Sequence, residues 1–256
     1  MFEVYTQQFI LFLMLFIRII ATLTTVPLFG HQSIPAQTKI GLGLFVAYVM
    51  YPITAHQAAA INQPLAGIVL IALKETLVGV LIGFTLGIVF AGVRYAGELI
   101  SSSMGLNAAN MFDPESTQSM PVLGEFMYLI TLLIFLLING HHFVFEALNI
   151  TFKAVPIGSL TFSDPLMQSL IHLTGMMFVV GVKIAAPVLV AIFLTNLGLS
   201  ILARVMPQAN ILMMSFPITI SVGLLVLLSS TPLLIVVFKK LLLSFEDNIM
   251  ELIRLM

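Results

Sequence analysis

The chain has 256 residues, of which 60% are hydrophobic and 8% are charged, and its formal net charge is −1. A soluble domain has about a quarter charged residues, so this composition excludes an ordinary soluble domain. The lack of a basic excess excludes a nucleic-acid-binding protein. The absence of cysteine excludes disulfides, thiolate metal sites and a cysteine nucleophile.

Long uncharged stretches make up most of the chain. An apolar stretch of about 18 or more residues is long enough to cross a bilayer as a helix. The pattern therefore predicts an all-α membrane protein with five or six such helices. The uncharged stretches are 19–38, 40–73, 76–93, 165–182, 184–203 and 205–238.

The first hundred residues predict three helical segments. The N-terminus has no positively charged region and no obvious cleavage site, so it predicts a retained first helix, Gln8–Thr25, rather than a signal peptide. A second helix is predicted over Ile40–Ile53. The stretch from Leu65 to about Gly105 predicts one long helix, or two helices separated at Lys74–Glu75.

Two further helices are predicted in the middle of the chain. The first covers Val122–Ile138, and the residues after it, 139–158, predict a mixture of half-helix and loop. Ser163 or Asp164 fits the N-cap of the next helix, and a proline fits its first turn. This helix is expected to reach about Leu202.

The last long helix is predicted over 209–238, followed by a separate short amphipathic helix. In that tail, apolar residues recur at three- and four-residue spacing with charged residues opposite them. This pattern is typical of a helix at a membrane surface or docked on a partner. The apolar residues are Leu242, Phe245, Ile249, Leu252 and Met256, and the charged ones are Asp247, Glu251 and Arg254.

Two series of small residues recur every four positions between 79 and 109. Such a stripe lets helix backbones approach closely, which favours helix association in lipid. Packing within the chain and a seam with another subunit explain the stripe equally well. The first series is Gly79, Gly83, Gly87 and Ala91, and the second is Gly97, Ser101, Gly105 and Ala109.

The residues that carry chemistry in enzymes show no catalytic pattern here. No histidine has zinc-protease spacing, and the adjacent His141 and His142 favour a surface loop over a metal site. The chain has no P-loop, nucleophile elbow or dinucleotide fingerprint. Glu125 fits the first turn of a helix, where negative charge is favourable. The sequence therefore predicts no enzyme, no cofactor and no metal site.

A secondary transporter stays open as the second functional class. Ionisable residues inside apolar stretches are costly in lipid and are functional candidates for that reason. Against this, Arg94 and Glu98 are four residues apart and can neutralise each other on a helix face. No repeat relates the two halves of the sequence, although many transporters show one. The ionisable residues concerned are Lys74, Glu75, Arg94, Glu98 and Lys183.

A polar, small-residue segment, 101–126, interrupts the apolar chain. Its glycine and asparagines tolerate unusual backbone angles, and irregular backbone at membrane depth is stable only against protein or water. Flexible methionines fill irregular gaps, so the segment fits a seal over an aqueous passage. A surface loop with incidental methionines fits equally well. The residues that suggest the seal are Met104, Met111, Phe112 and Met120.

Three stretches resemble the FliR family of flagellar biosynthetic proteins, which also occurs in virulence type III secretion systems. They are "MGLNAANMFDPESTQSMPVLGEFMYLITLLIFLLINGHH", "KIGLGLFVAYVMYP" and "ARVMPQANILMMSFPITISVG". The resemblance extends from Ile19 to the tail. The residues "MFDPESTQSMPVL" and "NGHH" favour the flagellar branch.

The resemblance implies a non-catalytic component of an export gate in the bacterial inner membrane and flagellar basal body. It implies a cone-like hetero-oligomer of helical hairpins with the membrane proteins FliP and FliQ, alongside other export-apparatus proteins and lipid. Unfolded flagellar subunits are expected to pass through its centre. By the same resemblance, 1–170 is a FliP-like unit and 171–256 is a FliQ-like hairpin with an amphipathic tail.

The resemblance also implies that the segment from Met104 to Pro121 is the plug that closes the pore. The residues carried over as the plug are Met104, Gly105, Met111, Phe112 and Met120. The residues carried over as shaping the loop are Asn107, Asn110, Asp113, Pro114 and Pro121.

Overall fold

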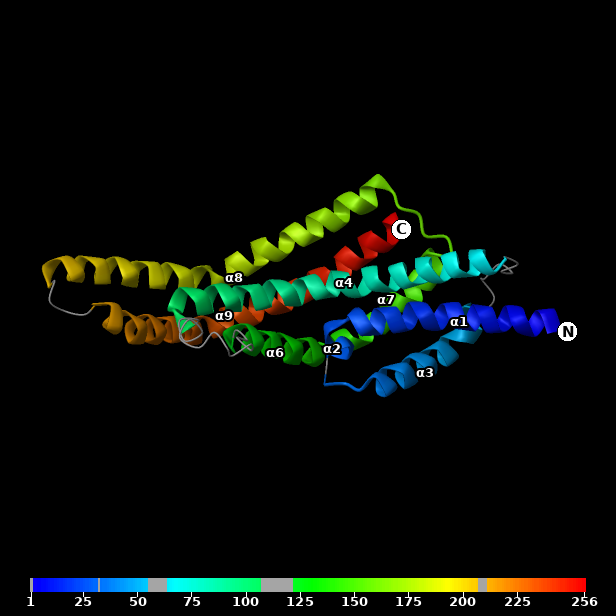
Figure 1. Cartoon of the computed structure of the whole chain (residues 1–256), viewed down its shortest axis with the longest axis horizontal. Helices are drawn as coiled ribbons and strands as arrows, with labels where there is room; N and C mark the ends of the chain where they lie inside the picture. Colours follow the sequence, from blue (N-terminus) through cyan, green and yellow to red (C-terminus); the bar gives the residue numbers. More distant parts are fainter. Residues whose placement is uncertain (1, 32, 55–63, 107–121, 207–210) are drawn as a thin grey trace. The chain divides into compact units, whose positions relative to one another are not determined.

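The computed structural model describes residues 2–31, 33–54, 64–106, 122–206 and 211–256. Within these residues every regular element is a helix, which confirms the prediction of an all-α membrane protein (Figure 1). The helices are α1 (Phe2–Thr25), α2 (Pro27–Gly30), α3 (Ala36–Thr54), α4 (Leu65–Met104), α6 (Val122–Leu137), α7 (Gly140–Ala154), α8 (Asp164–Val205) and α9 (Ile211–Leu255).

Three of these helices are much longer than a bilayer requires. Helices α4, α8 and α9 have 40, 42 and 45 residues, which is about 60 to 68 Å at 1.5 Å per residue. The hydrocarbon core of a bilayer is about 30 Å thick. In the described residues, four helices are long and apolar enough to cross a membrane, or five if α6 and α7, bent by 70°, form one span.

Of the two alternatives for 65–105, the single long helix is the one observed, and α4 is continuous through Lys74–Glu75. The two charged side chains turn to protein partners, as described below, so the helix does not have to end there. The prediction of a separate C-terminal helix was wrong, because α9 runs to Leu255. No glycine or proline follows Pro232, so nothing in the local sequence ends the helix earlier.

The region predicted as half-helix and half-loop is mostly helical. Asn139 adopts a left-handed conformation (φ 60°) and separates α6 from α7, which begins at Gly140. A left-handed residue ends one helix and redirects the chain, which accounts for the bend between them. His141 and His142 therefore lie in the first turn of a helix, with ring centroids 4.2 Å apart, rather than in the predicted loop.

The chain divides into two compact units that interleave along the sequence. The first unit contains 1–88, 135–173 and 242–256. Within it, α3 packs on α1 through Phe12 and Tyr51, whose ring centroids are 6.1 Å apart. The tail face predicted to be apolar is buried here, since Leu242, Phe245, Ile249 and Leu252 are each no more than 3% exposed.

The start of α8 is fixed to the end of α9 within the first unit. Ser163 is the N-cap predicted for α8, because its Oγ accepts a hydrogen bond from the backbone N–H of Leu166. The same hydroxyl donates to the carbonyl of Leu255 at 3.2 Å. Thr161 donates its backbone N–H and its hydroxyl to the carbonyl of Met256. These contacts fix the segment between α7 and α8.

The second unit contains 89–134 and 174–241, and it therefore holds parts of α4, α6, α8 and α9. Aromatic rings pack α4 against its neighbours: Tyr95 meets Phe178 of α8, and Phe90 meets Tyr128 of α6. Gly92 approaches the backbone of Met177 on α8. Small residues on α4 thus bring helices close in this unit, as a small-residue stripe predicts.

Candidate functional site

The candidate site is the point where the chain leaves α4 and enters the predicted plug segment. Met104 and Gly105 are described by the structure. The other predicted plug and loop residues lie outside the described residues: Asn107, Asn110, Met111, Phe112, Asp113, Pro114, Met120 and Pro121. The geometry of the site is therefore that of the root of the segment.

Met104, the last residue of α4, is anchored on α9. The Met104 side chain is fully buried. It occupies the space beside Gly223 of α9, and a Cβ at Gly223 would collide with the Met104 sulfur and terminal methyl. Its backbone carbonyl accepts a hydrogen bond from the Thr219 hydroxyl at 3.1 Å. Thr219 is only 5% exposed, so water does not compete for this bond.

Gly105 turns the chain away from α4. Its φ of +78° lies in the left-handed region that glycine adopts at little cost. Its backbone N–H donates to the carbonyl of Ser102 at 3.1 Å and closes the helix end. A Cβ at this position would also lie 2.9 Å from the ring of Phe216 on α9. Phe216, Thr219 and Gly223 thus form one face of α9 that holds the root of the segment.

The chain returns from the predicted plug segment into α6, which is clamped back onto α4. A Cβ at Gly97 would lie 2.5 Å from the Cα of Gly124, so the two backbones are in direct contact. Beside this contact Arg94 forms an ion pair with Glu125, and its guanidinium lies 5.2 Å from the ring centroid of Tyr128. Glu125 lies in the first turn of α6, as predicted.

Replacing Thr219 with valine is expected to destabilise the second unit by about 1 kcal/mol, because the side chain keeps its shape but loses the hydroxyl proton that the Met104 carbonyl, at 3.1 Å, shares with the Ser215 carbonyl of α9, at 2.9 Å. The matched control is Thr195→Val on α8, whose hydroxyl bonds only to the Ala191 carbonyl of its own helix. Both variants are compared with the parent by SDS-induced unfolding in mixed micelles. Equal losses would show that the bond to Met104 contributes nothing of its own.

The small-residue series packs within the chain at several of its positions. In the first unit Gly79 lies against the backbone of Arg18, and Gly83 lies against Thr25, both on α1. Gly87 has no atom within 4 Å of the position its Cβ would take. Ser101 is buried and Ala91 is half-buried. The stripe is therefore a seam between helices of this chain at Gly79, Gly83 and Gly97, and it faces open space at Gly87.

A buried ionic cluster organises the first unit. Arg18 on α1 is fully buried and pairs with Glu75 on α4 at 2.6 Å. Its Nη1 donates to the carbonyls of Thr151 and Val155 at the end of α7, at 3.2 and 3.0 Å. Its guanidinium also lies 4.5 Å from the ring centroid of Phe152. A cation at the negative end of a helix dipole is favourable.

The same cluster holds the turn that follows α7. Glu75 accepts the backbone N–H of Gly158 at 2.9 Å, and Lys74 donates to the Gly158 carbonyl at 3.1 Å. Gly158 has a φ of +80°, which only glycine adopts readily. The sequence marked Lys74 and Glu75 as unusual but did not identify Gly158 as their shared partner. Gly158 lies more than 80 residues further along the chain.

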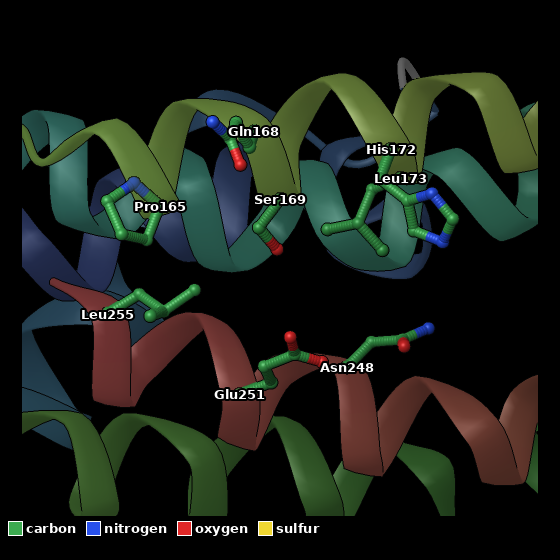
Figure 2. Close-up of a pocket in the computed structure, with 8 residues that line it drawn as sticks. All are labelled: Pro165, Gln168, Ser169, His172, Leu173, Asn248, Glu251 and Leu255. Atoms are coloured by element: carbon green, nitrogen blue, oxygen red, sulfur yellow. The ribbon is translucent and has the colours of Figure 1, made fainter.

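The first unit also contains a cavity of about 350 Å³ between the start of α8 and the end of α9. Figure 2 shows Ser169 of α8 and Glu251 of α9 pointing toward one another across it. Among the lining residues that the structure describes, His172 and Glu251 are the ionisable ones. In the described part of the chain, no three histidine, aspartate or glutamate side chains gather in a way that would hold a metal ion.

Comparison with known proteins identifies the family. The family model described as "Bacterial export proteins, family 1" matches residues 9–245. The chain belongs to this family. It is 32% identical to the flagellar biosynthetic protein FliR of Escherichia coli K12 over 238 residues, which cover 91% of this chain and 90% of the relative. It is 32% identical to FliR of Bacillus subtilis 168, with 89% and 88% covered.

These matches confirm the resemblance to the FliR family. A third relative, FliR of Pectobacterium carotovorum, is 33% identical over 219 residues, with 86% of this chain and 83% of the relative covered. The match covers the root of the predicted plug segment, the α9 face that holds it and the Arg18 cluster alike. All three features therefore lie within the residues that match the family model.

Proposed function

We propose that this chain is a non-catalytic core component of the flagellar type III protein export gate, in the bacterial inner membrane and the flagellar basal body. It forms and seals, with FliP and FliQ, a passage for unfolded flagellar subunits. The observation that carries the proposal is family membership over 9–245 together with relatives named flagellar biosynthetic proteins.

The long helices support the requirement for partner subunits. Helices α4, α8 and α9 are about twice as long as the hydrocarbon core is thick. Part of each apolar helix must therefore lie outside the hydrocarbon, where the rest of this chain or partner subunits must cover its apolar side chains. This agrees with a cone-like hetero-oligomer in which 1–170 is the FliP-like unit and 171–256 is the FliQ-like hairpin.

The sealing role falls to the segment from Met104 to Pro121. Its root makes close contacts: Met104 and Gly105 are held by α9, and α6 packs on α4 at Gly97. Apolar, flexible side chains carried on such a frame block ions by excluding water from a constriction. The residues that supply them in this proposal are Met111, Phe112 and Met120. Met104, whose side chain is buried against α9, anchors the segment, and Gly105 forms the turn.

Three of the five ionisable residues that suggested a secondary transporter have structural contacts inside the protein. Lys74 and Glu75 hold Gly158, and Arg94 pairs with Glu125. Each of these three side chains therefore has a structural contact inside the protein. Such contacts explain the presence of the charges in apolar helices without a solute-binding role.

Deleting 106–119 is expected to open the passage to ions, because the root and the clamp remain while the apolar seal is lost. The measurement is proton and sodium leak in membrane vesicles from cells that make the whole apparatus, with the amount of membrane-inserted chain determined in parallel. Replacing Met111, Phe112 and Met120 with serine at unchanged length is expected to leak as well. Replacing Thr117 and Gln118, which have no assigned role in the plug or in the shape of the loop, with serine is the control and should not leak.

A second readout separates the passage from the seal. The leaking variants are still expected to export flagellar subunits, because removing a seal does not remove the passage. A membrane that stays tight after the deletion, with the chain inserted at normal level, would contradict the sealing role. Normal export in cells that lack this chain would contradict its place in the export gate.

A further inference from the structure

The cavity between the start of α8 and the end of α9 has walls that are fixed inside the first unit. Its volume of about 350 Å³ is at the lower end of the range for ligand-binding pockets. Leu166 of α8 and Leu252 of α9 are fully buried, and Phe245 of α9 packs on Phe143 of α7 with ring centroids 5.5 Å apart. The hydrogen bonds from 161–163 to the last two residues join the two helices beside the cavity. The shape of the cavity is therefore set by the fold of this chain.

Five polar side chains from the two helices line the cavity. On α8 they occupy positions i, i+1 and i+4, and on α9 they occupy positions i and i+3, so each set lies on one side of its helix. Figure 2 shows an apolar end of the cavity at Pro165 and Leu255, followed by the polar side chains further along. The polar lining residues are Gln168, Ser169, His172, Asn248 and Glu251.

Within the part of the chain that the structure describes, none of these five polar side chains makes a hydrogen bond or an ion pair. Serine and threonine hydroxyls in apolar helices are commonly satisfied by the carbonyl four residues earlier, as those of Thr195 and Ser200 are on the same helix. Ser169 makes no such bond to the carbonyl of Pro165. Its hydroxyl is therefore available to a ligand in the cavity.

The lining has the chemistry of a cation-binding site. With histidine counted as neutral, the described lining residues carry one negative charge, that of Glu251, and no positive charge. The carboxylate, the two amide oxygens and the Ser169 hydroxyl can all accept hydrogen bonds. A side-chain ammonium or guanidinium brings several N–H donors and a compensating charge. The apolar end at Pro165 and Leu255 suits the methylene stem that carries such a group.

The surface beside the cavity favours a protein as the source of the cation. Met167 and Ile171 lie on α8 directly before Gln168 and His172, and their apolar side chains are 48% and 70% exposed in the single chain. A charged side chain seated in a pocket and surrounded by contacts that exclude water is typical of a binding hot spot. A dissolved cation would leave these apolar side chains uncovered, whereas the neighbouring subunits of the proposed function would cover them.

From these observations we propose that the cavity is the docking site for a lysine or arginine side chain of a neighbouring subunit. Glu251 is the ion-pair partner of that side chain, and Ser169 and Asn248 accept hydrogen bonds from it. The proposal rests on the proposed function, since it requires that the chain works among other subunits. It does not depend on the sealing role of 104–121.

Competition between the parent and Glu251→Lys for a place in the assembly tests the site. The two chains, distinguished by tags, are made at equal levels in the same cells together with the complete apparatus, and the intact particles are purified. The parent is expected to enter the particles at least about 30-fold more often, because the variant places a second cation against the docking side chain. SDS-induced unfolding of the isolated variant is expected to match the parent, because Glu251 has no ion pair in the described part of its own chain.

Glu246→Lys is the matched control. It makes the same charge change on an exposed residue of α9, about 140° around the helix from Glu251, and it should enter the particles as often as the parent. A benzophenone amino acid at Met167 is then expected to cross-link to one neighbouring subunit in the irradiated assembly. Replacing the lysine or arginine nearest to that cross-link with glutamate should restore the entry of Glu251→Lys.

Three results would overturn the proposal. Equal entry of the parent and Glu251→Lys would show that no cation is bound at Glu251 in the assembly, while the proposed function would stand. A parent chain that enters no particle would overturn the proposed function together with this site. Stabilisation of the isolated parent by spermidine, lost in Glu251→Gln, would show that the cavity takes a dissolved cation instead of a side chain of a subunit.

Discussion

Replacing Arg18 with alanine is expected to destabilise the first unit by about 3–5 kcal/mol, the range for removing one partner of a buried ion pair. Glu75, which is 1% exposed, would be left as a buried charge without its cation. The carbonyls of Thr151 and Val155 would lose their donor as well. SDS-induced unfolding of the purified protein in mixed micelles measures the loss.

Two further variants separate the charge effect from the loss of packing. Lys74→Ala removes a half-buried cation with one hydrogen bond to Gly158, and it is expected to cost no more than about 1.5 kcal/mol. The double variant Arg18→Met/Glu75→Leu removes both charges and keeps apolar volume, so its loss should be smaller than that of Arg18→Ala. A double variant that is less stable than Arg18→Ala would contradict this account of the cluster.

Replacing Gly97 with alanine is expected to destabilise the second unit by about 1–3 kcal/mol. The added Cβ would fall 2.5 Å from the Cα and 2.7 Å from the backbone nitrogen of Gly124. Backbone atoms cannot move aside as a side-chain end can, so α4 and α6 would have to separate. Ion leak through the assembled apparatus is measured in parallel with unfolding, because this contact lies at the return of the segment 104–121.

Gly87→Ala on the same helix is the matched control, and its expected effect on the free energy of unfolding has the opposite sign. No atom lies within 4 Å of its added Cβ, and alanine is the better helix former by about 0.5–1 kcal/mol. It is therefore expected to be neutral or stabilising in the isolated chain. If both glycine variants were equally destabilised, the backbone contact between Gly97 and Gly124 would not explain the effect.

The helices could be predicted from local sequence because long uncharged stretches and caps are local signals. Such patterns predict the helix start at Val122, the N-cap at Ser163 and the apolar face of the tail, which is buried. The prediction stayed open where the deciding contact is distant. The sequence allowed one helix or two around Lys74–Glu75, because Arg18, the partner of Glu75, lies 57 residues away. The tail suggested a separate helix because charged residues follow the long apolar stretch there, although α9 continues through them.

The root of the predicted plug segment could be predicted only in part. Gly105 was marked by the sequence as a place for unusual backbone, and its φ of +78° agrees with that. The α9 face that holds it was not predicted, because the hydroxyl of Thr219 is 115 residues from the carbonyl that it binds. The spacing of Phe216, Thr219 and Gly223, three and four residues apart, was the one available signal, since it places them on one helix face. The sealing role itself stays a prediction.

The Arg18 cluster also imposes an order on folding during synthesis. Arg18 is made early, whereas Glu75 follows 57 residues later and the carbonyls of Thr151 and Val155 follow 133 and 137 residues later. At about 5–20 residues per second, Arg18 waits about 3–11 s for its anion after it is made. A bare guanidinium is costly in lipid, so α1 cannot settle there alone. The N-terminal helix is therefore committed to its final place only after α4 and α7 have been made.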